Sequence, residues 1–192
     1  MAGVIGTMVG SLFLKYLGPV IGPIFGRWSL TIFGRHRRLS HKDILKATDE
    51  LCEAISNGGF IPHYILGIDG AGLYIASLIG NGFKAPVIEF AADRRDPAHP
   101  RFPKDKEFFE KLKTIIKDKR ILLVDDLSYT GQTLRNAKET LQGIVEEVKI
   151  AVISIPHKSL LREKGMYPAI YNYSAKGFEH KGRESIKFPW PV

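Results

Sequence analysis

Two adjacent carboxylates and a polar turn follow one another in the second half of the chain. The run ILLVDDLSYTGQTL covers residues 121–134, and its apolar part ends at Asp125 and Asp126. Carboxylates paired at the end of a buried strand can hold hydroxyl groups or a cation. The polar turn consists of Ser128, Tyr129, Thr130, Gly131, Gln132 and Thr133. At the start of a helix, the backbone N–H groups and hydroxyls of this turn predict a cradle for an anion such as a phosphate.

An ordinary strand, turn and helix with polar turn residues is the alternative interpretation of this run. Short turns that contain glycine and threonine are common in proteins. The combination of two acids with Gly131 and a helix N-terminus favours the cradle, because glycine permits the close approach or positive φ that a cradle requires.

The elements that position this site alternate between strand and helix. Short apolar runs predict strands at residues 64–68, 86–90, 120–126, 148–155 and 169–174. Helical spacing predicts helices after Ser40, through LYIASLIG at residues 73–80, at residues 107–116 and after Gly131. This order is typical of an α/β fold, a parallel sheet with helices on both faces, and such sheets bind ligands at the carboxyl ends of their strands.

Local signals mark the ends of two segments. Ser40 and Asp43 resemble a capping box that opens a helix, and Gly58 and Gly59 stop this helix. The stretch AADRRDPAHPRFPKDK, residues 91–106, is dense in charge and proline, which predicts a mobile loop.

Residues 1–38 form a hydrophobic, glycine-rich segment with a basic flank, ahead of a polar domain at residues 39–192. Only two charges lie between residues 4 and 33, so this stretch is long enough to span a bilayer once as a helix. The basic flank favours a domain on the cytoplasmic side, attached to the membrane through residues 1–35. Two prolines inside the stretch leave a soluble arm, buried in a homo-oligomer, as the alternative.

The composition favours anionic partners. The chain has 192 residues with 28 Lys and Arg against 20 Asp and Glu, a net charge of +8. This surplus suits phosphates, an acidic lipid surface or nucleic acid, although the sequence contains no nucleic-acid-binding motif. The single cysteine, Cys52, excludes a disulfide framework and a multi-cysteine zinc site.

The central run resembles the signature of the type I phosphoribosyltransferases. That signature is a hydrophobic strand, two acidic residues and a turn of the form x-x-T-G-x-T, and VDDLSYTGQT at residues 124–133 matches it position by position. GIDGAGL at residues 67–73 lies where the family has its pyrophosphate loop. The ending IKFPWP is similar to that of the short xanthine- and hypoxanthine-guanine-type members. The resemblance runs from Ser40 to the C-terminus and implies the parallel-sheet fold of this family.

The resemblance also implies a role for each part of the site. Asp125 and Asp126 would hold the ribose hydroxyls of phosphoribosyl pyrophosphate together with Mg²⁺. Asp125, Asp126 and Tyr129 are the catalytic candidates, and Tyr129 stands where the family's purine enzymes often carry an acid that accepts the base proton. The substrate-binding candidates are Asp69, Gly70, Ala71 and Gly72 for the leaving pyrophosphate, Ser128, Thr130, Gly131, Gln132 and Thr133 for the 5′-phosphate, and Lys158 for an oxopurine oxygen. The loop at residues 91–106 would close over the site with Arg94, Arg95, Arg101 and Lys104.

The activity that the resemblance implies is transfer of ribose 5-phosphate from phosphoribosyl pyrophosphate to a purine-like nucleobase. The chain differs from the family's pattern at Gly70, where Arg or Lys is frequent, at Tyr129, and at Ser185, where an aromatic residue stacks on the purine. A second hypothesis is therefore kept, in which the chain binds a nucleoside monophosphate or phosphoribosyl compound as a sensor or membrane effector without turnover.

Overall fold

The computed structural model describes residues 36–93, 95, 101–128, 130–155, 171–179 and 185–189. The hydrophobic stretch of residues 1–35, predicted to be helical, lies outside the described residues, and the segment 1–38 ends in strand β1 (His36–Arg38). Residues 38–182 and 186–192 form one compact unit, which holds the central sheet, the helices and the candidate site. None of the helices in the described ranges is long and apolar enough to cross a membrane.

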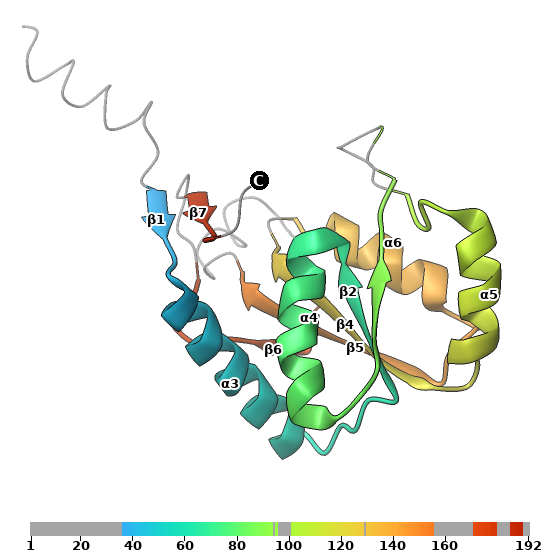
Figure 1. The fold of residues 1–192 in the computed structure, drawn as a ribbon, viewed down its shortest axis with the longest axis horizontal. Coiled ribbons are helices and arrows are strands. Elements are labelled where there is room, and N and C mark those ends of the chain that lie inside the picture. The colour runs from blue at the N-terminus through green and yellow to red at the C-terminus, as the bar shows by residue number, and fades with distance from the viewer. Residues whose placement is uncertain are drawn as a thin grey trace, which may run out of the picture. The chain divides into compact units, whose positions relative to one another are not determined.

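Five parallel strands form the central sheet, in the order β3-β2-β4-β5-β6. They are β2 (Tyr64–Ile68), β3 (Val87–Phe90), β4 (Arg120–Leu127), β5 (Glu147–Ser154) and β6 (Tyr173–Ser174). Gly67 of β2 lies opposite Val124 of β4, so the carboxyl ends of these two strands meet (Figure 1). The predicted α/β fold with a parallel sheet is therefore confirmed.

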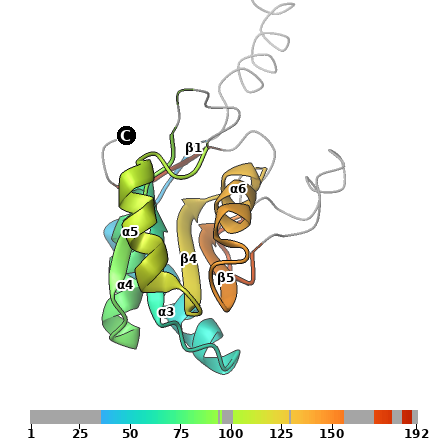
Figure 2. The same ribbon diagram turned by 90° about the vertical axis from the view of Figure 1, so that its right-hand side faces the viewer.

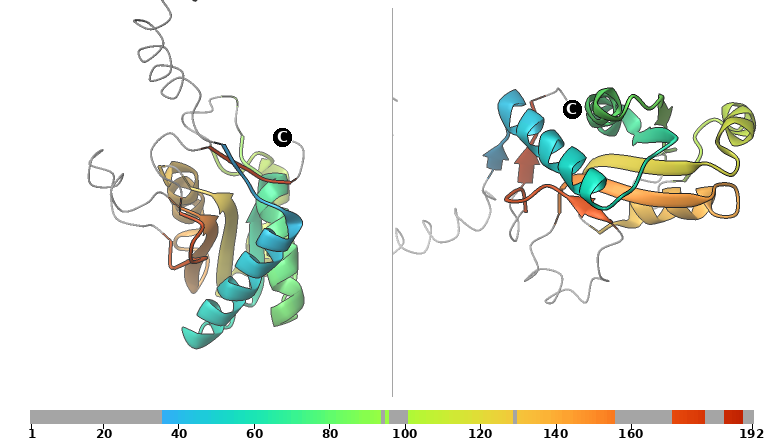
Figure 3. Two further views of the ribbon diagram at one scale, coloured as in Figure 1. Left: turned by 90° about the vertical axis from the view of Figure 1, so that its left-hand side faces the viewer. Right: turned by 90° about the horizontal axis from the view of Figure 1, so that it is seen from below.

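Helices pack on both faces of this sheet, as predicted. They are α3 (His41–Asn57), α4 (Asp69–Phe83), α5 (Lys106–Ile116) and α6 (Gln132–Leu141). Leu122 belongs to the apolar core under α3 and α4, whereas Leu123 belongs to the core under α5 and α6. Successive strand residues point to opposite faces, which explains this alternation. Figures 2 and 3 show α6 across the sheet from α4 and α3.

The start of α3 follows local signals in the sequence, whereas α4 starts earlier than predicted. The Ser40 N–H donates to Asp43 Oδ2 (2.8 Å) and the Asp43 N–H donates to Ser40 Oγ (3.2 Å), which is the predicted capping box. α3 ends at Gly58, also as predicted. The prediction of a loop at residues 69–72 is wrong, because α4 begins at Asp69 and these residues form its first turn.

A separate two-stranded sheet, which was not among the predicted elements, is formed by β1 and β7 (Ser185–Lys187). The N–H of Leu39 donates to the carbonyl oxygen of Lys187 (2.9 Å). The side chains of Leu39 and Ile186 are buried in the core under α3 and α4. Leu39, which precedes α3, and Lys187 of the C-terminal segment therefore lie side by side.

The direction in which the chain crosses the sheet reverses between β2 and β4. α4 connects β2 to its neighbour β3 on one side, and α5 then returns the chain to β4 on the other side. Open α/β sheets bind ligands at such a switch point, outside the carboxyl ends of the strands. Here the end of β2 leads into Asp69, and the end of β4 carries Asp125 and Asp126.

Candidate functional site

The two carboxylates at the end of β4 have different surroundings. Asp125 is buried, with 7% of its surface exposed, and its Oδ1 accepts a hydrogen bond from the N–H of Asp126 (2.9 Å). Asp126 is partly exposed. Asp125 therefore holds the backbone at the strand end, and Asp126 is the more accessible of the two acids.

The polar turn after β4 surrounds a cavity of about 290 Å³, which we call the cradle. The lining residues are Asp125, Asp126, Leu127, Ser128, Thr130, Gly131, Gln132, Thr133 and Leu134. Gly131 has φ 73° and ψ 3°, the left-handed conformation that glycine adopts without strain. The N-cap residue Gly131 has no side chain to cap α6, so apart from the N–H of Gln132, which donates to Thr130 Oγ1, the N–H groups of the first turn can bind an anion.

The cradle is anchored to β5 by one buried backbone hydrogen bond, and β5 is in turn bonded to the segment around Phe178. The N–H of Ser128 donates to the carbonyl oxygen of Ser154 (2.9 Å), and Ser154 Oγ donates to the carbonyl oxygen of Phe178 (2.5 Å). Within the turn, Thr130 Oγ1 accepts from the N–H of Gln132 (3.3 Å). These contacts hold the turn in place before any ligand binds, which lowers the entropic cost of binding.

A second cavity, of about 1030 Å³, borders the cradle, and we call it the outer cavity. It is lined by residues of four segments: Gly70, Ala71 and Tyr74 of α4, Asp126 and Leu127 of β4, Arg38, Leu39 and His41 around the start of α3, and Ile186, Lys187, Phe188 and Pro189 of the C-terminal segment. Asp126 and Leu127 line both cavities. A ligand held at Asp126 can therefore place one end in the cradle and the other in the outer cavity.

The first turn of α4 packs directly against the end of β4. A Cβ atom on Gly72 would lie 2.7 Å from the carbonyl oxygen of Val124 and 3.3 Å from Cα of Asp125. A Cβ on Gly70 would meet nothing within 4 Å. Gly72 is therefore required for the close approach of the turn to the acids, whereas Gly70 faces the outer cavity.

Asp69 makes a contact that the sequence does not indicate. Its Oδ1 accepts a hydrogen bond from the N–H of Ala92 (2.8 Å), and its own backbone has φ 49°, in the left-handed region. Asp69 lines neither the cradle nor the outer cavity. The structure thus places this predicted ligand residue as a link between the first turn of α4 and the segment after β3.

We expect Asp69→Ala to lower the affinity for phosphoribosyl pyrophosphate by about tenfold, because it leaves the buried Ala92 N–H without its acceptor and forces alanine into a left-handed conformation. Asp69→Asn keeps an acceptor oxygen, and asparagine tolerates this backbone conformation, so we expect it to bind within about twofold of the wild type. Calorimetric titration in the presence of Mg²⁺ measures both. Equal losses in the two variants would instead point to direct contact of the charge with ligand.

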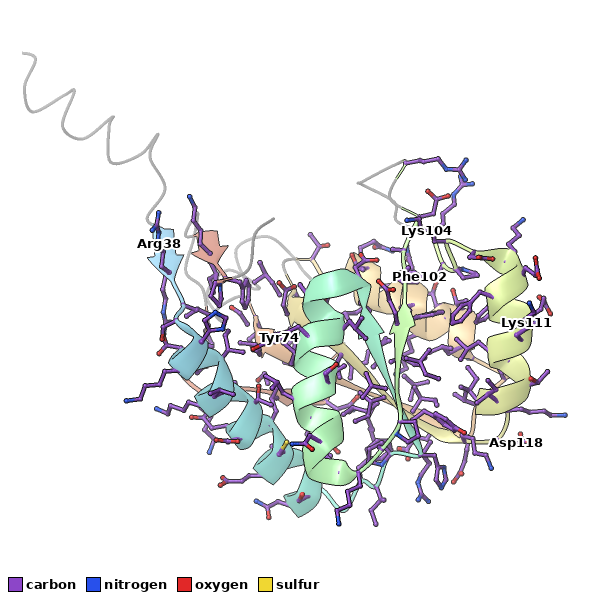
Figure 4. The ribbon with its side chains drawn as sticks, viewed as in Figure 1. Arg38, Tyr74, Phe102, Lys104, Lys111 and Asp118 are labelled. Atoms are coloured by element: carbon purple, nitrogen blue, oxygen red, sulfur yellow. The ribbon has the colours of Figure 1, made fainter. Side chains whose placement is uncertain are left out.

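The segment between β3 and α5 is closed at its base. Asp93 and Arg101 exchange two backbone hydrogen bonds (2.8 and 3.0 Å), and the ring of Phe102 stacks on Phe90 with centroids 4.9 Å apart (Figure 4). Arg95 donates to the carboxylate of Asp93, and this hydrogen bonding lowers the pKa of Asp93 to about 2. The predicted loop therefore has a structured base, with Arg95 engaged at it.

The two acids suit a magnesium ion. Carboxylate oxygens are the ligands that Mg²⁺ prefers, and it commonly keeps several waters and substrate phosphate oxygens as its other ligands. Within the described ranges, no three His, Cys, Asp or Glu residues gather into a metal-binding group. A magnesium ion beside Asp125 and Asp126 would therefore depend on substrate and water for most of its coordination.

The structure brings together most of the predicted site, and it adds residues that were missed. The cradle contains every described member of the predicted phosphate turn. Tyr129, Lys158 and Arg94 lie outside the described residues. Arg38, assigned to the basic flank of the N-terminal segment, lines the outer cavity together with Tyr74 and Lys187. No sequence signal links these three residues, because they are far apart in the chain.

Solved structures share this fold. A purine phosphoribosyltransferase from Pyrococcus horikoshii matches with a TM-score of 0.60 and 21% identity, over 82% of this chain and 94% of that one. A hypothetical protein from Neisseria gonorrhoeae with bound ppGpp matches with a TM-score of 0.63 and 20% identity, over 83% and 91%. A xanthine-guanine-hypoxanthine phosphoribosyltransferase from Helicobacter pylori matches with a TM-score of 0.60 and 16% identity, over 82% and 95%. At these identities the likeness concerns the fold.

The sequence gives an independent comparison. The chain is 30% identical over 120 residues to the bifunctional protein PyrR of Pediococcus pentosaceus, a match that spans 57% of this chain and 66% of that protein. The phosphoribosyl transferase domain matches residues 38–192, which include the cradle, the acids and both ends of the outer cavity. The chain therefore belongs to the phosphoribosyl transferase domain family, a family of glycosyltransferase-type enzymes.

Proposed function

We propose that the chain transfers the ribose 5-phosphate of phosphoribosyl pyrophosphate to a purine-like nucleobase, with Mg²⁺. The position of Asp126 carries this proposal: it lines both the cradle and the outer cavity. A ribose held there would have its 5′-phosphate in the cradle and its C1 substituents in the outer cavity. The volume of about 1030 Å³ leaves room for both a diphosphate and a base.

Each described part of the site has a task in this reaction. The uncapped N-terminus of α6 and the turn residues bind the 5′-phosphate. Asp125 and Asp126 hold the ribose hydroxyls, and Mg²⁺, when bound, offsets charge on the diphosphate. Tyr74 and Phe188 give the outer cavity aromatic surface on which a base can stack.

The chemical step exchanges one bond at C1 for another. The C1–O bond breaks and its electron pair leaves with the diphosphate, while a ring nitrogen of the base forms the C1–N bond and its proton passes to solvent water. Positive charge develops on the ribose between these events, and the nearby carboxylates stabilise it electrostatically.

Product formation tests the proposal directly. The full chain is incubated with phosphoribosyl pyrophosphate, Mg²⁺ and one of hypoxanthine, guanine, xanthine, adenine or uracil. We expect a nucleoside monophosphate and pyrophosphate, both detected by mass spectrometry, with at least one purine. Binding of phosphoribosyl pyrophosphate without product from any base would contradict the proposal.

Such a result would favour the second candidate function, a nucleotide-binding sensor without turnover. The observation behind it is Gly70, which gives the first turn of α4 no positive charge near the leaving group. A sensor needs the cradle and the acids for binding, but it does not need a group that stabilises departing pyrophosphate.

We also propose that residues 1–35 attach the domain to the cytoplasmic face of a membrane. The support is the apolar stretch between residues 4 and 33, followed by basic residues. We expect the full chain to float with phospholipid vesicles in a density gradient. A variant with Leu12→Asp and Leu17→Asp should stay at the bottom, because each charge costs about 3 kcal/mol in the bilayer centre. Equal flotation of both chains would contradict this.

A further inference from the structure

Basic side chains outnumber acidic ones among the described residues that line the outer cavity. Arg38, His41 and Lys187 line it, against Asp126 as the acid among the described lining residues. Arg38 ends β1 and Lys187 ends β7, so the two cations come from opposite ends of the domain sequence. A cavity with this lining suits a ligand that carries several negative charges.

Arg38 and Lys187 are held close to each other by the backbone. The hydrogen bond from the Leu39 N–H to the carbonyl oxygen of Lys187 (2.9 Å) places the residue after Arg38 directly against Lys187. Both side chains are exposed, and among the described residues no carboxylate forms an ion pair with either. Two neighbouring cations without an acid between them repel each other, and a bound anion relieves that repulsion.

The first turn of α4 lacks the positive charge that a leaving diphosphate requires. Residues 69–72 contain one acid and no base, and Gly70 faces the same cavity as Arg38 and Lys187. A Cβ on Gly70 would meet nothing within 4 Å, so the space beside this turn is open. Protein side chains that add positive charge beside a diphosphate in this cavity would therefore come from other elements, and Arg38 of β1 and Lys187 of β7 line the cavity.

We propose that Arg38 and Lys187 bind the diphosphate of phosphoribosyl pyrophosphate and replace the cation missing at Gly70. This inference rests on the proposed function of the same site. The arrangement makes binding of the diphosphate depend on the pairing of β1 with β7. The diphosphate end and the 5′-phosphate end of the ligand are then recognised by separate groups, the cation pair and the cradle.

The test compares two ligands that share the 5′-phosphate and differ in the diphosphate. Calorimetric titration of the full chain with phosphoribosyl pyrophosphate, and separately with ribose 5-phosphate, is carried out with Mg²⁺. Arg38→Ala and Lys187→Ala should each lower the affinity for phosphoribosyl pyrophosphate about fivefold, and the double variant should lower it about 30-fold. The affinity for ribose 5-phosphate should stay within about twofold of the wild type. A matched control, Lys119→Ala with Lys138→Ala, removes the same charge from exposed positions outside both cavities.

A compensating variant makes the test specific for the diphosphate. Gly70→Arg, added to the Arg38→Ala and Lys187→Ala double variant, should restore at least fivefold of the lost affinity, because the open space at Gly70 admits a side chain. Failure to restore any affinity would overturn the assignment of the two cations to the diphosphate.

The outcomes separate this inference from the proposed function. If the unaltered chain binds neither ligand, the proposed function fails. If the unaltered chain binds both ligands, two results defeat the cation-pair inference alone. In the first, the double variant keeps its affinity for phosphoribosyl pyrophosphate; in the second, it loses affinity for ribose 5-phosphate to the same extent. If the control variant loses as much affinity for phosphoribosyl pyrophosphate as the double variant does, the effect comes from overall net charge. That result would also overturn the cation-pair inference.

Discussion

Asp126→Asn is expected to lower kcat/KM for phosphoribosyl pyrophosphate by about 100-fold, while the melting temperature stays within about 2 °C of the wild type. The substitution keeps the size of the side chain and removes the negative charge from a partly exposed position that lines both cavities. Hydrogen bonds to a charged group contribute about 1.5–3 kcal/mol each, so loss of the charge weakens the contacts with ribose hydroxyls and magnesium.

Asp125→Asn separates the role of the buried acid from that of its neighbour. The asparagine oxygen can still accept the Asp126 N–H, but its amide adds two donors at a buried position. We therefore expect a similar loss of activity together with a lower melting temperature. Asp118→Asn is the matched control: it removes the same charge from an exposed residue before β4, at the other end of the strand (Figure 4).

Steady-state rates and melting temperatures of the three variants distinguish the roles of Asp125 and Asp126. Asp118 has φ 54°, a conformation that asparagine also tolerates, so the control should match the wild type in both measurements. Full activity of Asp126→Asn would remove Asp126 from the ligand-binding machinery and with it the observation that carries the proposed function.

The acids and the cradle could be predicted because they are consecutive in the sequence. A buried strand, two acids and a turn into a helix need no long-range information, since the backbone itself brings residues 125–134 together. The capping box at Ser40 and Asp43 was predictable for the same reason. Strand positions followed from apolar runs, and the alternation of helix and strand led to the sheet.

The outer cavity could not be predicted, because it depends on contacts between distant residues. β1 and β7 are three residues each, too short for a periodic pattern, so the neighbourhood of Arg38 and Lys187 was not visible. The bond between Asp69 and Ala92 joins residues 23 positions apart and likewise leaves no local signal. Arg38 was assigned to a membrane flank because its nearest neighbours in sequence are basic.

The first turn of α4 was assigned as a loop because GIDGAGL lies where the resembled family has its pyrophosphate loop, and close packing against β4 requires one of its glycines. A large effect is therefore expected at Gly72. We predict that Gly72→Ala lowers the free energy of unfolding by about 2 kcal/mol and the melting temperature by about 6 °C. The new Cβ would meet the Val124 carbonyl oxygen at 2.7 Å, and this backbone atom cannot move aside without disturbing β4.

Gly70→Ala is the matched control for Gly72→Ala, two positions earlier in the same turn. Its Cβ meets nothing within 4 Å, and alanine favours the helix, so its melting temperature should equal or exceed that of the wild type. Differential scanning fluorimetry of both variants, with and without phosphoribosyl pyrophosphate and Mg²⁺, gives stability and binding together. In Gly72→Ala the turn must move away from the acids, so we also expect a smaller stabilisation by ligand. If the two variants melt alike, the close approach of α4 to β4 is not what positions the acids against the outer cavity.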